Sequence, residues 1–377
     1  MTAATHFYRI AAHAVAPILA VEGVRTVYVR RSVAAGDARF PWSDLDLAVV
    51  MDGASAADLL RLWKRWRIAR LVFPRLGEGQ IFAPGDLAPY AGTDPYRASL
   101  DRRFCYLAYG ERPVIPERAV DERAAARRLV FWFQRYLPQV MRRGRIRDQR
   151  KIALEMYNAL GVLEGRWKEP LATRVETESR ARAAGLLAGG ALEHPFAAGC
   201  RAAERACELL SLSVPAIPGV LELNGLLIVP PSEADGSVAA INPAETIVTP
   251  AALQMLLEMH DPFLWLGHGA ALAPLGFAPP SRRAWLEAAA RVARADLLRT
   301  PGFMGKKPQA VEATLGLAEQ VVSQLASGEA IDVRRERVTA RPYSDAAAFY
   351  RDGYDELAAR GNSLYRRAMG LLADLVD

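Results

Sequence analysis

Two hydrophobic runs joined by a short polar loop constrain this chain more than any other feature. Residues 27–52 read VYVRRSVAAGDARFPWSDLDLAVVMD, and the second run carries Asp44 and Asp46 two positions apart. Side chains at this spacing point to the same face of an extended strand. Two adjacent carboxylates repel each other unless a cation lies between them. The pattern therefore predicts a site for a hard divalent cation such as Mg²⁺ on this strand.

The residues around the two aspartates extend the pattern. The stretch resembles the signature of the DNA polymerase β-like nucleotidyltransferase superfamily, in which a Gly-Ser turn follows one strand and Ser-Asp-x-Asp lies on the next. The matching positions are Ser32, Ala34, Gly36, Ser43, Asp44 and Asp46. Arg31 departs from it, because the family normally has a glycine there, which lets the backbone approach the nucleotide phosphates. A guanidinium at this position can instead contact a phosphate oxygen.

The resemblance implies an Mg²⁺-dependent, ATP-binding type of transferase, with Mn²⁺ as a possible substitute ion. Such an enzyme moves a nucleoside monophosphate from a nucleoside triphosphate to an acceptor hydroxyl and releases pyrophosphate. Asp44 and Asp46 would bind one or two metal ions, which clamp the attacking and leaving oxygens of an in-line displacement. The residues that would bind the nucleotide in and before this strand are Arg31, Ser32, Gly36 and Ser43.

A third carboxylate often completes the metal site in this superfamily. Glu78 is the preferred candidate, either as a metal ligand or as the base that takes the acceptor proton, because it begins a predicted strand at 77–83. A surface position at the start of that strand is the alternative for Glu78. Asp86 and Asp101 are weaker alternatives for the third acid.

The hydrophobic periodicity predicts an α+β fold. Helices are expected at 5–20, where Phe7 and Ile10 belong to the apolar stripe, at 54–70 and at 343–376; strands are expected at 24–29, 45–51, 77–83 and 104–109. We therefore predict a nucleotidyltransferase-type mixed sheet with flanking helices in residues 1–117. A helical domain at 118–215 and a mainly helical region at 216–377, with a short β-excursion at 221–248, complete the expected organisation.

A basic segment marks the predicted helical domain. It ends at Lys151, which we expect to open a helix and to place a cation near the nucleotide's phosphates. A solvated turn between helices is the alternative for this segment, whose members are Arg142, Arg143, Arg145, Arg147, Arg150 and Lys151.

Composition limits the partners and the compartment. The formal net charge of +6 favours anionic partners such as nucleotides but is too small to indicate nucleic-acid binding. Three cysteines and the lack of a secretory-type or membrane-spanning apolar run predict a cytoplasmic protein that does not bind membranes. The acceptor is expected to be a small molecule or a nucleotide, with a nucleic acid or a protein also open. The alternative function is a catalytically impaired nucleotide sensor or interaction protein on the same fold.

Overall fold

The computed structural model divides the chain into two compact units. One unit contains Met1–Arg118 and Trp285–Asp377, and the other contains Ala119–Ala284. The structure describes residues 2–53, 55–132, 146–187, 282–294, 308–330 and 346–375, together with isolated positions between 192 and 227. Within these residues, no helix has both the length and the apolar character needed to cross a bilayer.

A four-stranded mixed sheet forms the centre of the first unit, in the order β3-β2-β1-β4. β1 pairs antiparallel with β2 and with β4, whereas β2 pairs parallel with β3. The parallel pair needs a crossover, and the helix α3 supplies it. The four strands are β1 (Val24–Val29), β2 (Leu45–Met51), β3 (Leu76–Phe82) and β4 (Tyr106–Gly110).

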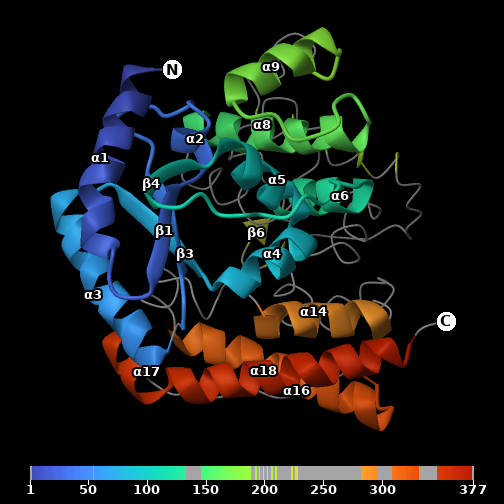
Figure 1. The fold of residues 1–377 in the computed structure, drawn as a ribbon. Coiled ribbons are helices and arrows are strands. Elements are labelled where there is room, and N and C mark those ends of the chain that lie inside the picture. Colours follow the sequence, from blue (N-terminus) through green and yellow to red (C-terminus); the bar gives the residue numbers. More distant parts are fainter. Residues whose placement is uncertain are drawn as a thin grey trace. The chain divides into compact units, whose positions relative to one another are not determined.

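Helices cover both faces of this sheet, with α1 and α3 on one side and α4 and α5 on the other (Figure 1). Trp66 of α3 packs so closely on β3 that only a glycine fits at position 79. On the opposite face, Tyr28, Val50 and Phe82 form a core with residues of α4 and α5. The helical segments are α1 (Ala3–Leu19), α2 (Arg31–Ala34), α3 (Ala56–Val72), the 3₁₀ turn η1 (Pro84–Asp86), α4 (Leu87–Thr93) and α5 (Pro95–Phe104).

The first two strands match the predicted bounds, but the buried stripe of α1 does not. Tyr8 and Val15 are fully buried, while Phe7 is 46% and Ile10 57% exposed. The prediction that Phe7 and Ile10 face the core is wrong, because apolar residues recur on more than one side of this helix and the sheet covers only one.

Four helices from the end of the chain belong to the same unit. The predicted helix at 343–376 is two helices, since the chain breaks at Gly353 between α17 and α18. Arg360 of α18 joins α16 by an ion pair with Glu319, at 2.6 Å. The helices are α14 (Arg282–Arg294), α16 (Pro308–Ser327), α17 (Ala346–Asp352) and α18 (Tyr354–Ala373). The sequence analysis had treated residues 216–377 as one region.

The described part of the second unit is mainly helical. α6 (Glu122–Phe131), α8 (Ile146–Leu163) and α9 (Arg174–Ala183) pack in sequence, α6 on α8 and α8 on α9. Two short strands, β5 (Glu222–Leu223) and β6 (Leu226–Leu227), pair antiparallel within the predicted β-excursion. The rest of residues 221–248 lies outside the described residues, as does most of the basic segment before α8.

Candidate active site

Asp44 and Asp46 lie side by side at the start of β2. Asp46 is in the strand, and Asp44 directly precedes it rather than lying within it. The pairing of β2 with β3 shifts register between Leu45 and Leu47, so Asp46 occupies an irregularity of the parallel pair. Such irregularities redirect side chains near active sites.

A glycine in the neighbouring strand makes room for both acids. A Cβ at Gly77 would lie 3.0 Å from the Asp46 Oδ1 and 3.3 Å from the Asp44 Cβ. The two aspartates therefore lie on the face of the strand pair toward which a side chain at position 77 would point. Arg70 of α3 fixes this part of β3 by donating hydrogen bonds to the carbonyls of Leu76 and Gly77, at 3.2 and 3.3 Å.

Each aspartate has an arginine beside it. The Arg31 Nη1 lies 3.2 Å from the Asp46 Oδ1, and the Arg75 Nη1 lies 3.7 Å from the Asp44 Oδ1. Asp46 is the less accessible acid, with 15% of its side chain exposed, while both arginine side chains are about half exposed. The local arrangement is thus two carboxylates balanced by two guanidinium groups.

Arg31 has an unusual backbone conformation for its residue type. Its φ of 57° lies in the left-handed region, and among the described residues it is the only non-glycine with a positive φ. This conformation costs an L-residue about 1–2 kcal/mol relative to right-handed backbone. The signature that the sequence resembles has a glycine where this chain has Arg31, and the backbone here has a conformation that suits glycine.

The preceding residue, Arg30, is held in place by both its backbone and its side chain. Its backbone N–H donates to the Asp46 carbonyl at 2.9 Å. Its buried side chain donates to the Asp101 carboxylate at 2.6 Å and to the Tyr90 hydroxyl at 2.7 Å. Asp101 is thus used inside the core, which removes it as an alternative third metal ligand. Asp86 is also used structurally, because its carboxylate accepts a hydrogen bond from the N–H of Ala83.

The turn after Arg31 has the expected form. α2 begins at Arg31, and Gly36 closes the turn with a φ of 85°. No atom lies within 4 Å of where a Gly36 Cβ would be, so a side chain would fit. The turn requires glycine because of the positive φ. Ser32 is partly buried, and its carbonyl accepts the N–H of Asp37 at 2.8 Å.

Ser43 closes the loop that leads into Asp44. Its hydroxyl accepts the N–H of Arg39 at 2.9 Å, and its own N–H donates to the Arg39 carbonyl at 2.8 Å. The Tyr8 hydroxyl donates to the Ser43 carbonyl. Burial raises the pKa of Tyr8, the nearby Arg75 lowers it and Asp44 raises it, so the tyrosine stays protonated as a donor.

The remaining predicted site residues have different placements. Glu78 follows Gly77 in β3, next to the two acids in the sheet, but its side chain lies outside the described residues. Lys151 is exposed in α8 of the second unit. It does not open that helix, which begins at Ile146 and already includes Arg147 and Arg150 before Lys151.

Sequence reasoning missed Arg75, Gly77 and Tyr8. Arg75 and Gly77 flank the start of β3, and their proximity to Asp44 depends on the parallel pairing of two strands that are distant in the chain. A glycine in a predicted strand is a signal of close backbone approach and could have indicated Gly77. No comparable signal marks Tyr8.

The pair of aspartates fits a divalent ion that is bound together with a phosphate-bearing ligand. Their oxygens are hard donors, and Mg²⁺ commonly uses one or two carboxylates with phosphate and water as its other ligands. Within the described part of the chain, no set of three or more His, Cys, Asp or Glu side chains is arranged to bind an ion. Asp44 and Asp46 would hold the ion.

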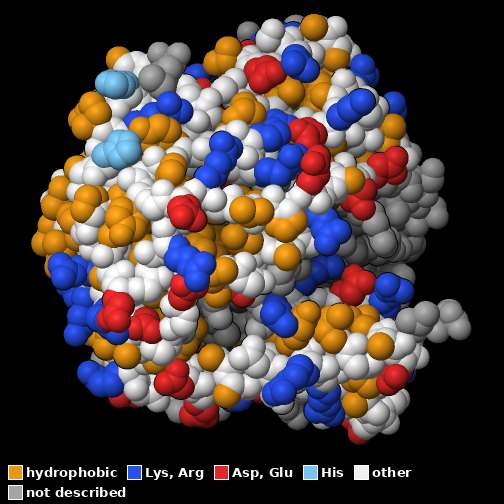
Figure 2. Space-filling model, in the orientation of Figure 1, with side chains coloured by type: hydrophobic (Ala, Val, Ile, Leu, Met, Phe, Trp, Pro, Cys, Tyr) orange, Lys and Arg blue, Asp and Glu red, His pale blue; other side chains and the backbone are white. Residues whose placement is uncertain are grey.

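An exposed aromatic surface lies next to this site. Phe40 and Trp42, in the loop before Ser43, are 60% and 61% exposed. The rings of Phe40 and Phe7 meet edge to face, with centroids 5.3 Å apart. Figure 2 shows hydrophobic side chains gathered over α1 and α3, the elements that bear this surface.

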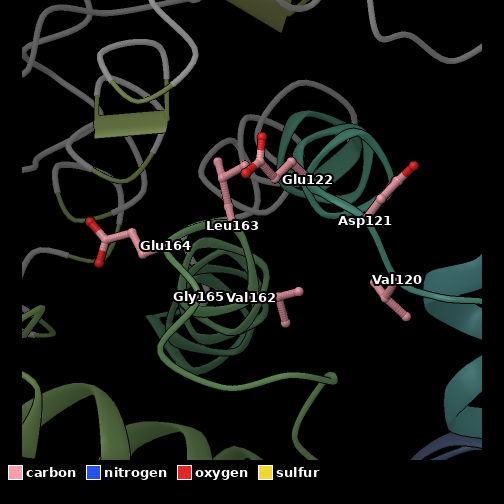
Figure 3. A pocket seen from close by; sticks show the side chains of 7 residues that line it. All are labelled: Val120, Asp121, Glu122, Val162, Leu163, Glu164 and Gly165. Carbon is pink, nitrogen blue, oxygen red and sulfur yellow. The ribbon is translucent and has the colours of Figure 1, made fainter.

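A cavity of about 560 Å³ lies elsewhere, within the second unit, between the start of α6 and the end of α8. Figure 3 shows Val120 and Val162 on facing sides of it, with the carboxylates of Asp121 and Glu164 pointing outward in different directions. Asp121 caps α6 through the N–H of Ala124, and Glu164 pairs with Arg205 at 3.0 Å. Asp121 and Glu164 therefore have structural roles.

Comparisons of this chain with models of known families, with curated proteins and with solved structures find no match.

Proposed function

We propose that this chain is a metal-dependent nucleotidyltransferase. It would transfer a nucleoside monophosphate from a nucleoside triphosphate to a hydroxyl of a small molecule or of another nucleotide, and release pyrophosphate. The observation that carries the proposal is the placement of Asp44 and Asp46 side by side next to Gly77, one short loop after the turn from Arg31 to Gly36. A small mixed sheet with helices on both faces, as expected from the sequence, supports the proposal.

The reaction joins the acceptor oxygen to the α-phosphorus and breaks the bond from that phosphorus to the oxygen that bridges to the β-phosphorus. The electron pair of the broken bond leaves with pyrophosphate, and the acceptor proton passes to a base. Mg²⁺, when bound, supplies charge neutralisation for the triphosphate and lowers the pKa of the acceptor hydroxyl.

The chain's own residues would bind, orient and neutralise the reactants. Asp44 and Asp46 would hold the ion, and the guanidinium groups beside them, Arg31 and Arg75, would stabilise charge on the phosphates. Ser32 offers a hydroxyl to the triphosphate, and Glu78 is the proposed base or third ligand.

The test uses the purified chain with Mg²⁺ and each of the four nucleoside triphosphates, alone and with hydroxyl-bearing acceptors, and measures pyrophosphate release. Asp44→Asn and Asp46→Asn should each reduce the rate at least 100-fold, because a neutral amide neither holds nor balances a divalent ion as a carboxylate does. Asp374→Asn, at the exposed end of α18, is the matched control and should keep the wild-type rate. Turnover near the wild-type level in Asp44→Asn would refute the proposed site.

A nucleotide sensor without turnover is the second candidate. The ion pair of Arg31 with Asp46 favours it, because a guanidinium there competes with a metal ion for the carboxylate. Nucleotide binding in calorimetry without pyrophosphate release from any substrate set would select the sensor.

A further inference from the structure

Four arginines lie around the two aspartates, and they fall into two classes. Arg30 is 3% exposed and fixed by Asp101, and Arg70 is tied to the backbone carbonyls that begin β3. Arg31 and Arg75 instead have half-exposed side chains whose ionic partners are Asp46 and Asp44. Arg31 and Arg75 can therefore turn away from the acids without breaking the core.

The backbone at Arg31 gives a second, independent observation. A left-handed conformation is unfavourable for every residue except glycine and, to a lesser degree, asparagine and aspartate. This strained backbone carries the Arg31 side chain, whose guanidinium pairs with Asp46. A cation thus lies on one of the two candidate metal ligands. Strained backbone at a site supports a functional hypothesis for the strained residue.

We propose that Arg31 and Arg75 act as exchangeable counterions that make metal binding depend on the nucleotide. This inference rests on the proposed function and concerns the same site. Without a ligand, the two guanidinium groups neutralise Asp46 and Asp44, so a divalent ion alone gains little by displacing them. A triphosphate brings its own negative charge, to which the guanidinium groups transfer, and the carboxylates are released to the ion that arrives with it.

The exchange predicts opposite effects of one substitution on two ligands. Arg31→Gly removes the guanidinium and suits the left-handed backbone, so Asp46 becomes available to a metal ion without a nucleotide. We expect Mn²⁺ alone to bind about tenfold more tightly than in the wild type, because a half-exposed charge about 4 Å away acts largely through water. The same variant should bind tripolyphosphate, in the presence of Mn²⁺, about tenfold more weakly.

The experiment measures free and bound Mn²⁺ by electron paramagnetic resonance, and tripolyphosphate binding by calorimetry. Tripolyphosphate is the probe because it carries no base, so the result does not depend on which nucleotide the protein uses. Arg75→Gln should change both affinities in the same directions as Arg31→Gly and provides an independent second variant. Arg25→Gln is the control. Arg25 is an exposed residue of β1 that pairs with Asp52, so this variant should change neither affinity.

The outcomes separate this inference from the proposed function. Unchanged Mn²⁺ affinity in both arginine variants, with Mn²⁺ binding still abolished by Asp46→Asn, overturns the exchange and leaves the metal site intact. Mn²⁺ binding that is unaffected by Asp44→Asn and Asp46→Asn, or no binding of Mn²⁺ even with tripolyphosphate, overturns the metal site and the exchange together.

Discussion

Tyr8 donates a hydrogen bond from its hydroxyl to the backbone carbonyl of Ser43, the residue directly before Asp44. Tyr8 is fully buried in α1, and its ring contacts those of Phe40 and Phe73. A residue of the first helix therefore supports the loop that positions the candidate metal ligand.

Tyr8→Phe removes the donor and keeps the ring. The buried Ser43 carbonyl loses a partner, so we expect the free energy of unfolding to fall by about 1–2 kcal/mol in urea titrations. Pyrophosphate release should fall as well, because the loop that bears Asp44 is less restrained. Tyr106→Phe is the control, since it removes an exposed hydrogen bond to His13 and should leave both quantities nearly unchanged. Equal stability of the two variants would contradict the supporting role of Tyr8.

Two glycines of β3 separate function from stability. In Gly77→Ala the new methyl lies 3.0 Å from the Asp46 Oδ1, so the carboxylate must shift by a few tenths of an ångström. The free energy of unfolding of Gly77→Ala should change by less than about 1 kcal/mol, while its Mn²⁺ affinity and turnover should fall. In Gly79→Ala the methyl would lie 2.0 Å from the Trp66 ring, and overpacking should cost about 1–3 kcal/mol or more. Thermal denaturation and Mn²⁺ binding of both variants check this contrast, which equal stability losses would refute.

The buried ion pair of Arg30 and Asp101 is expected to be structural. Burial lowers the pKa of Arg30, but Asp101, Tyr90 and Tyr28 together raise it by more, so the net pKa lies well above its ordinary value. Asp101→Asn leaves an uncompensated charge in the core and should cost about 3–5 kcal/mol of unfolding free energy. Asp52→Asn breaks the exposed pair with Arg25 and should cost less than about 1 kcal/mol. Chemical denaturation of both variants measures the difference, and a small loss in Asp101→Asn would show that the core adapts around Arg30.

Sequence patterns predicted the strands well and the site only in part. β1 and β2 begin and end at the predicted residues because β-branched runs are bounded by turn residues at both ends. The proximity of Asp44 and Asp46 follows from their spacing of two residues, which is visible in the sequence. The contact of Arg75 with Asp44 and the close approach of Gly77 depend on how β3 is registered against β2, which local patterns do not specify.

The helices show the same division between local and long-range information. Periodicity located α1, but only the sheet determines that Tyr8 is buried and Phe7 exposed. The break between α17 and α18 at Gly353 was missed, because a single glycine inside a helical pattern is often tolerated. The left-handed backbone of Arg31 could not be read from its residue type, which disfavours that conformation.

Tyr350 links stability to pH above neutrality. Its hydroxyl is buried in α17 with no hydrogen-bond partner among the described residues. Burial, and then the neighbouring Tyr354, raise the pKa of Tyr350 well above the ordinary value near 10. The folded state therefore keeps a proton that the unfolded chain loses above about pH 10. Because the unfolded state then binds fewer protons, stability falls as pH rises through this range, by about 1.4 kcal/mol per pH unit for one such group.

Tyr350→Phe removes this group while its ring contacts with Phe349 and Tyr354 can remain. At pH 7 the variant should be as stable as the wild type or more stable by about 1 kcal/mol, since a buried hydroxyl without a partner is lost. Between pH 10 and 11 its advantage should grow by up to about 1.4 kcal/mol, the contribution of one proton. Urea titrations at pH 7, 10 and 11 give the slopes. Parallel stability curves for the variant and the wild type would mean that Tyr350 ionises as readily in the folded chain as in the unfolded chain.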